Sequence, residues 1–235
     1  MYRSHGVWIP QLLALALILA GCANSRPEGL PRGINEAFLD DDLDVDAYVE
    51  RFEGESRAVY AERNAIVDAL ALAPGQSVAD IGAGTGFFSF LFADAVGREG
   101  RVYAVEISRP FLDHLRIESL SRGLTAVEVV EGSARSVALP PSSTDLAFIC
   151  DVYHHFEYPT DSLTSLHEAI RPGGALVLIE FHRVPGESPE WLLEHVRAGQ
   201  EVFQAEIEAA GFQFEEEILL TGLDDNYFLR FRRLD

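Results

Sequence analysis

The segment 78–89, Val-Ala-Asp-Ile-Gly-Ala-Gly-Thr-Gly-Phe-Phe-Ser, places the strongest constraint on the fold. Its first four residues predict a short buried strand, its three glycines predict a tight turn, and Phe87 onward predicts a helix with one apolar face. Where a strand, a glycine turn and a helix meet, backbone N–H groups and the positive end of the helix dipole converge. Because glycine also lets a ligand approach the backbone closely, the segment predicts a ligand-binding edge.

Two common nucleotide-binding motifs do not match this segment. A dinucleotide fingerprint needs G-x-G-x-x-G, and Phe87 stands where its third glycine would be. A phosphate-binding P-loop needs a lysine, and the sequence contains none. An acidic residue followed by G-x-G-x-G instead resembles the first motif of class I S-adenosylmethionine-dependent methyltransferases. A glycine turn in another kind of α/β domain is the alternative that the motif alone leaves open.

The resemblance implies that this turn binds S-adenosylmethionine. The helix N-terminus suits the carboxylate of the cofactor, and Asp80 suits its ammonium group, through water. The residues that the resemblance assigns to the cofactor here are Asp80, Gly82, Ala83, Gly84 and Gly86.

A second cofactor contact is expected at the end of the strand predicted over 101–106. Its last residue is Glu106, and a carboxylate about 20 residues past a glycine turn can accept hydrogen bonds from both ribose hydroxyls. NAD enzymes share this feature, so it indicates a nucleoside without discriminating between the two families. By resemblance, Ile107 packs on the adenine.

The next two predicted strands add three more candidates. The strand predicted over 125–130 is followed by Ser133 and Ala134, where the family usually carries an aspartate or asparagine for the adenine amino group. A serine hydrogen-bonds more weakly and at shorter reach. Asp151 directly follows the strand predicted over 144–150, and we include it in the cofactor site.

The run Asp151-Val-Tyr-His-His-Phe156 lies where the methyl group should meet its acceptor. Ligands of open α/β sheets bind outside the carboxyl ends of strands, where the strand order reverses. The run resembles the fourth motif of small-molecule methyltransferases, and we predict Tyr153, His154 and His155 as catalytic. A histidine could act as general base, since its pKa lies near neutrality, and Tyr153 could orient the substrate or shield the sulfonium. A structural hydrogen bond or a helix cap is the alternative role of either histidine.

A metal site is the less favoured use of these histidines. His154, His155 and His182 would be its ligands, but adjacent histidines on one loop rarely point at one ion. We therefore predict no metal. Cys150 ends an apolar strand and is expected to be a small buried hydrophobe rather than a nucleophile.

Residues 45–235 carry the resemblance almost end to end, and it implies one three-layer, Rossmann-like α/β domain. A helix is expected over 47–72, where the resemblance would let Tyr48, Arg57 or Tyr60 touch the cofactor, although ordinary helix surface and core is the favoured role.

The last third of the chain matches the same family. Arg171-Pro-Gly-Gly174 before an apolar strand is a marker of the fold. A helix over 191–210 and two antiparallel strands over 213–220 and 226–232 follow it. The resemblance implies a seven-stranded sheet of order 3-2-1-4-5-7-6 that ends in this antiparallel hairpin.

The N-terminus predicts export. Residues 1–21 carry an early arginine and an apolar run that is short for a membrane span. They lead into Leu19-Ala-Gly-Cys22, which resembles the lipobox of bacterial lipoproteins. We expect lipidation of Cys22, a flexible tether over 22–44, and a lipid-anchored protein on the periplasmic face of the bacterial cell envelope, where Ala23 favours the outer membrane. An uncleaved N-terminal anchor is the alternative.

The net charge of −20, with arginine as the only basic residue besides histidine, argues against nucleic acid as a partner. Because no large insertion is present to grip a macromolecule, a small-molecule or lipid-like acceptor is expected. A second hypothesis is a membrane-tethered protein that binds the cofactor without catalysis, since S-adenosylmethionine is made in the cytosol. An NAD-binding oxidoreductase is the third, weakened by Phe87 and the terminal hairpin.

Overall fold

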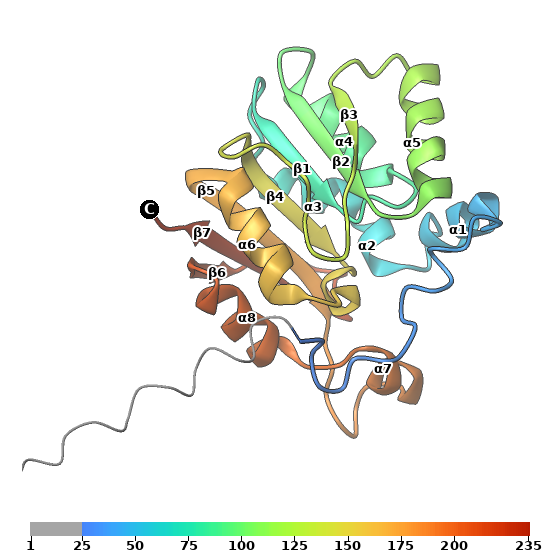
Figure 1. Ribbon diagram of the computed structural model, residues 1–235, viewed down its shortest axis with the longest axis vertical. Helices are drawn as coiled ribbons and strands as arrows, with labels where there is room; N and C mark the ends of the chain where they lie inside the picture. Colours follow the sequence, from blue (N-terminus) through green and yellow to red (C-terminus); the bar gives the residue numbers. More distant parts are fainter. Residues whose placement is uncertain (1–24) are drawn as a thin grey trace, which may run out of the picture.

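Seven segments of the chain form one sheet in the computed structural model, which describes residues 25–235 (Figure 1). The strands are β1 (Ser77–Ile81), β2 (Arg101–Glu106), β3 (Val127–Glu131), β4 (Thr144–Cys150), β5 (Ile170–Phe181), β6 (Phe212–Glu217) and β7 (Asn226–Arg233). Their order across the sheet is β3-β2-β1-β4-β5-β7-β6. β7 runs antiparallel to β5 and β6, and the remaining neighbours are parallel. The predicted order and the closing hairpin are confirmed.

The central strands are covered on both faces, which explains their sequences. In β1 and β4, successive residues are buried, so both strands are largely apolar runs rather than alternating patterns. Because β1, β2 and β4 are parallel, their carboxyl ends meet at one edge of the sheet. That edge brings together Gly82, Glu106 and Asp151, which end or directly follow these strands.

Helices form the two outer layers. They are α1 (Val45–Phe52), α2 (Ala58–Ala61), α3 (Arg63–Leu70), α4 (Phe87–Val96), α5 (Arg109–Ser121), the short 3-10 helix η1 (Tyr153–His155), α6 (Pro159–Ala169), α7 (Glu190–His195) and α8 (Gln200–Ala209). Apolar side chains of α6, α7 and α8 share one core with the sheet, and those of α3 and α4 form a second core with it. A smaller cluster joins Phe90 of α4 to Leu115 of α5.

Both of the long helices predicted from sequence are interrupted. The one expected over 47–72 is α1, α2 and α3, and the chain between α1 and α2 brings Arg57 within 2.7 Å of the Asp151 carboxylate. The one expected over 191–210 is α7 and α8, and Arg183 donates to carbonyls at the end of α7 at 2.6 and 2.9 Å. In both cases an arginine side chain forms polar contacts at the interruption.

Residues 34–38, which we call the strap, pack on the domain although they fall within the predicted tether. Ile34 and Asn35 are 8% and 7% exposed. Phe38 contacts the rings of Tyr48 and His155, with centroids 5.4 and 5.3 Å apart. In Figure 1 this part of the chain, in blue, runs past α7 before it reaches α1. The packed region therefore begins before residue 45.

The predicted signal segment 1–21 and Cys22 lie outside the described residues. Among residues 25–235, every helix falls short of the length and apolar character that a membrane crossing requires.

Candidate functional site

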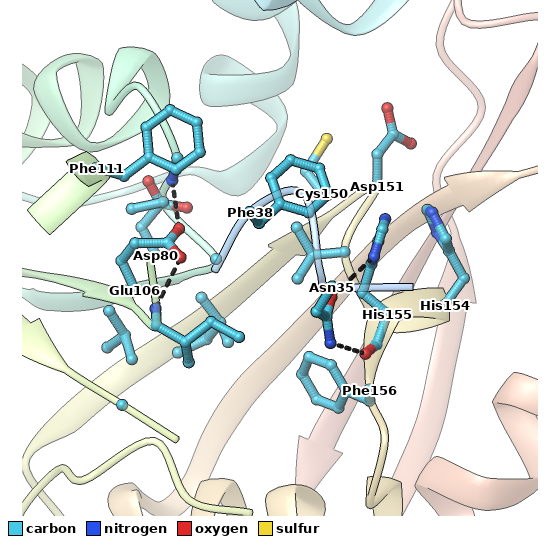
Figure 2. A pocket seen from close by; sticks show the side chains of 18 of the residues that line it. Asn35, Phe38, Asp80, Glu106, Phe111, Cys150, Asp151, His154, His155 and Phe156 are labelled. Carbon is cyan, nitrogen blue, oxygen red and sulfur yellow. Dashed lines mark hydrogen bonds between the residues drawn. The ribbon is translucent and has the colours of Figure 1, made fainter. Parts of the chain in front are cut away.

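A cavity of about 570 Å³ lies at the carboxyl edge of the sheet, beneath the strap, α1 and α7. We call the part lined by Asp80, Glu106 and Ser133 the cofactor end, and the part lined by His154 and His155 the acceptor end. Figure 2 shows Asp80 and Glu106 on one side and the two histidines on the other, with Phe38 between them. The residue groups predicted separately from the sequence therefore face one continuous space.

The glycine turn has the conformation that its sequence predicts. Gly82 has φ +72°, and a Cβ added there would lie 2.5 Å from the side chain of Val152. Gly82, Ala83 and Gly84 line the cavity. Gly86 does not: it is buried, and a Cβ there would lie 2.5 Å from the Leu115 side chain. Gly86 lets α4 begin while α5 packs against it.

Asp80 is buried under the turn and is 4% exposed. One carboxylate oxygen accepts a hydrogen bond from Ser89 Oγ at 2.5 Å. Burial raises the pKa of Asp80 to about 7. Close by on the turn, Thr85 lines the cavity, and its buried Oγ1 has no hydrogen-bond partner within residues 25–235. A carboxylate, an unpaired hydroxyl and the N-terminus of α4 together fit the zwitterionic end of the predicted cofactor.

Glu106 is held by backbone N–H groups on both sides. One oxygen accepts from Gly84 N at 2.8 Å, and the other accepts from Ile107 N and Ser108 N at 2.7 and 2.9 Å. Burial raises the pKa of Glu106, and these three donors oppose the rise. Because a carboxylate has about four acceptor sites, Glu106 retains capacity for a ribose hydroxyl.

Ile107, Ser133 and Ala134 line the same end of the cavity, as predicted. Ser133 Oγ already accepts from the backbone N–H groups of Arg135 at 3.3 Å and Ser136 at 3.1 Å. Its two lone pairs are therefore engaged, and its hydroxyl hydrogen is the group that it can offer to an adenine.

Asp151 lines the cavity and has a left-handed backbone, with φ +52°. Its carboxylate accepts from Arg57 Nη2 and Asn226 Nδ2, each at 2.7 Å. Burial raises the pKa of Asp151 above its ordinary value, and the Arg57 guanidinium offsets part of this rise. Tyr48 and Arg57 line the cavity, whereas Tyr60 packs on Phe87 instead.

Cys150 also lines the cavity, and burial raises the pKa of its thiol well above the ordinary range. A thiol in that state is a poor nucleophile, in agreement with the sequence-based interpretation.

Tyr153 corrects one of our catalytic assignments. It is fully buried, is absent from the cavity wall, and donates from its hydroxyl to Glu206 of α8 at 2.8 Å. Arg197 holds the same carboxylate through both of its terminal nitrogens. Tyr153 therefore anchors η1 to α8, and the prediction that it faces the acceptor is wrong.

His154 and His155 do line the cavity, and each is fixed by a polar partner. His154 Nδ1 lies 2.8 Å from the buried carboxylate of Glu180. His155 Nδ1 lies 3.1 Å from Asn35 Oδ1, while Asn35 Nδ2 donates to the His155 carbonyl at 3.1 Å, as Figure 2 shows.

The predicted role of His155 as general base is not supported. Burial, together with the neighbouring His154 and His195, lowers the pKa of His155 to about 2. A nitrogen with so acidic a conjugate acid accepts a proton poorly at neutral pH.

Among the residues of the acceptor end that the sequence missed are Asn35, Phe38 and His195. His195 belongs to α7, and its ring centroid lies 5.0 Å from that of His154 and 5.1 Å from that of His155. The structure thus groups His195 with the pair, while His182 packs on Tyr227 instead. No local pattern signals these three residues, because only the fold brings them to the cavity.

Comparison with known proteins agrees with this geometry. Residues 79–178 match a family described as "Methyltransferase domain". The chain is 31% identical over 134 residues to an uncharacterized 37.1 kDa protein of transposon TN4556 from Streptomyces fradiae, covering 57% of this chain but only 36% of that protein. It is 24% identical over 180 residues to the ubiquinone/menaquinone biosynthesis C-methyltransferase UbiE of Ruegeria sp. (strain TM1040), covering 64% of this chain and 72% of UbiE.

A solved structure supports the fold as well. The S-adenosylmethionine-dependent methyltransferase of Aquifex aeolicus superposes with a TM-score of 0.70 at 19% identity. The match covers 82% of this chain and 100% of the Aquifex aeolicus chain. At this level of identity the likeness shows the shared fold.

Proposed function

The chain carries an S-adenosylmethionine-dependent methyltransferase domain of the class I fold, and from that premise we propose that it methylates a small, lipid-like acceptor at the envelope membrane. The single observation that carries this proposal is which residues line the two ends of the cavity. One end offers the groups that hold S-adenosylmethionine, and the other end is walled by aromatic rings and histidines.

Different residues of the cofactor end would bind different parts of the cofactor. Asp80 and the N-terminus of α4 would hold the zwitterionic end of the cofactor, Glu106 the ribose, and Ile107 with Ser133 the adenine. When bound there, S-adenosylmethionine supplies an electrophilic methyl group on a sulfonium. The protein contributes by placing an acceptor in line with that methyl group and by excluding water.

The acceptor end supports an apolar, ring-containing substrate. Its wall includes the aromatic side chains of Phe38, Phe156, Phe181 and Trp191. Flat rings stack favourably on such side chains, with ring centroids typically about 4.5–7 Å apart. The name of the UbiE relative, a methyltransferase of quinone biosynthesis, supports the same class of acceptor.

Calorimetric titration of the full-length chain with S-adenosylmethionine tests the cofactor end. We expect micromolar binding, and we expect Asp80→Ala to weaken it about thirtyfold through loss of a charged partner. Asp94→Ala is the matched control, because Asp94 is an exposed aspartate on α4 outside the cavity. Equal affinity in all three proteins would remove the assigned role of Asp80.

Transfer of a labelled methyl group to fractionated membrane lipid and quinone extracts tests the acceptor. Label in an apolar, ring-containing product supports the proposal. Cofactor binding without label in any fraction would favour a binding protein that has kept the fold without the reaction.

The localisation is part of the proposal and rests on the pattern Leu19-Ala-Gly-Cys22. Lipidation of Cys22 by more than one acyl chain gives firm anchoring and keeps the cavity near membrane-partitioned acceptors. Labelled palmitate should enter the wild-type chain and not Cys22→Ser, and the variant should leave the membrane fraction. Equal labelling of both proteins would refute the anchor.

A further inference from the structure

Three histidines from two distant parts of the chain meet at the acceptor end of the cavity. His154 and His155 come from η1 at the end of β4, and His195 ends α7. One ring nitrogen of each lies within 4.8 Å of one ring nitrogen of both others. All three line the cavity, so the cluster faces the space that the acceptor would occupy.

Two of these rings are already oriented by outer partners. Glu180 engages Nδ1 of His154, and Asn35 engages Nδ1 of His155, which leaves Nε2 of each ring for another ligand. Metal-binding histidines almost always have such a carboxylate or carbonyl partner on the second nitrogen, because it fixes the ring and its tautomer. Burying a carboxylate costs free energy, and a core formed only by apolar packing does not require one. The fully buried Glu180 beside the buried His154 imidazole therefore indicates a role beyond packing.

We propose that His154, His155 and His195 bind one divalent transition-metal ion, with zinc the expected species, and leave a coordination position open to the cavity. Imidazole nitrogens suit such ions, and three protein ligands with one open position are the arrangement of catalytic zinc sites. An ion at the centre of three nitrogens that lie up to 4.8 Å apart would be about 2.8 Å from each nitrogen. Side-chain rotations that move each nitrogen by less than about 1 Å would shorten these distances to the usual zinc–nitrogen distance of about 2.0–2.1 Å.

The charges around the cluster are mixed. The Glu180 carboxylate lies 2.8 Å from His154 Nδ1, and Arg51 also lines the cavity. Asp151, another residue of the cavity wall, is paired with Arg57. An ion at the cluster would therefore gain from a further negative charge at its open position. An anionic oxygen of the acceptor supplies that charge.

The chemistry of this site rests on the proposed methyl transfer. A phenol or enol oxygen that binds the ion loses its proton to water, because the ion lowers the pKa of the oxygen. The resulting electron-rich acceptor forms a bond to the methyl carbon through oxygen or a conjugated ring carbon. The carbon–sulfur bond breaks with its electron pair on sulfur, and the neutral thioether leaves. An attacked ring carbon also gives its proton to water.

Metal titration of the full-length, tag-free chain after chelator treatment tests the site. We expect one Zn²⁺ or Co²⁺ per chain, and visible absorption of the cobalt form typical of four-coordinate geometry. His195→Ala should weaken binding at least about a hundredfold, in line with loss of one ligand. The matched control His182→Ala removes a histidine outside the cluster and should bind like the wild type.

A second variant keeps the test independent of folding. His195→Cys replaces one zinc ligand by another, so we expect it to restore binding and to add a sulfur-to-cobalt charge-transfer band. Binding that is equal in wild type, His195→Ala and His182→Ala would overturn the proposal, as would no binding by a folded wild type. Parallel titration with S-adenosylmethionine separates the outcomes, because a protein that binds the cofactor and no metal loses only this inference.

Discussion

The two ends of the cavity are assembled in opposite ways. At the cofactor end, Asp80 is held by Ser89, and Glu106 is held by Gly84, Ile107 and Ser108, all within one strand–helix–strand unit. At the acceptor end, Asn35, His155 and His195 come from three separate parts of the chain. Backbone geometry defines the first end and side-chain partners define the second. A change to the backbone of the cofactor end should therefore destabilise the fold. Loss of one side-chain partner at the acceptor end should instead reduce methyl transfer and leave cofactor binding nearly unchanged.

The largest expected effect breaks the backbone of the cofactor end. Gly82→Ala places a Cβ 2.5 Å from Val152 Cγ1 in a residue with φ +72°. Left-handed strain and overpacking together should lower the free energy of unfolding by about 3 kcal/mol. Urea unfolding followed by circular dichroism measures the change.

Gly123→Ala is the matched control for this variant. Gly123 follows the end of α5 with φ +66°, and an added Cβ meets no atom within 4 Å, so only the left-handed strain of about 1 kcal/mol applies. Equal losses in the two variants would show that close packing against Val152 does not constrain the turn.

A pH titration sharpens the comparison at Asp80. Burial raises the pKa of Asp80 to about 7, and the ammonium group of the cofactor favours the ionised carboxylate. At lower pH the carboxyl is protonated and must release its proton on binding, so affinity should fall about tenfold from about pH 8 to about pH 6.

Asp80→Asn provides the control, because an amide does not titrate in this range. Its calorimetric affinity for S-adenosylmethionine should be weaker and nearly flat over the same interval. A wild-type profile as flat as that of the variant would contradict the assigned contact.

A smaller effect is expected from Asn35→Ala at the acceptor end. The variant removes both hydrogen bonds between the strap and His155. We expect cofactor affinity to stay within about twofold and methyl transfer to fall about fivefold, which corresponds to roughly 1 kcal/mol. Trypsin should also cut faster at the exposed Arg32, just before the strap.

Glu36→Ala serves as the control for the strap, since Glu36 is exposed and does not line the cavity. Its cleavage and transfer rates should match those of the wild type. A loss of cofactor affinity in Asn35→Ala as large as its loss of transfer would mean that the two ends are not separable.

This difference also explains what the sequence could predict. The strand order and the positions of Asp80, Glu106 and Ser133 were accessible, because local motifs place those residues at known points of a recurring fold. The packing of Gly86 against Leu115 could not be predicted, because a glycine needed for packing looks the same in sequence as one needed for a ligand. His195 was missed because an isolated histidine within the helix predicted over 191–210 carries no signal until α7 is placed.

Tyr153 shows the same limit in a motif that was otherwise informative. An aromatic residue beside two histidines suggests a shared face, but η1 turns Tyr153 into the core and the histidines toward the cavity. Three adjacent residues therefore serve two purposes, and only the turn between β4 and α6 decides which serves which.

The smallest expected effect tests this assignment of Tyr153. Tyr153→Phe removes one hydrogen bond to Glu206, which Arg197 still holds, so the free energy of unfolding should fall by about 0.5–1 kcal/mol. Cofactor affinity and transfer rate should not change. In a double-mutant cycle with Glu206→Ala, the stability losses should be less than additive, because both changes remove the same contact. A transfer rate reduced about tenfold with unchanged stability would instead return Tyr153 to the acceptor side.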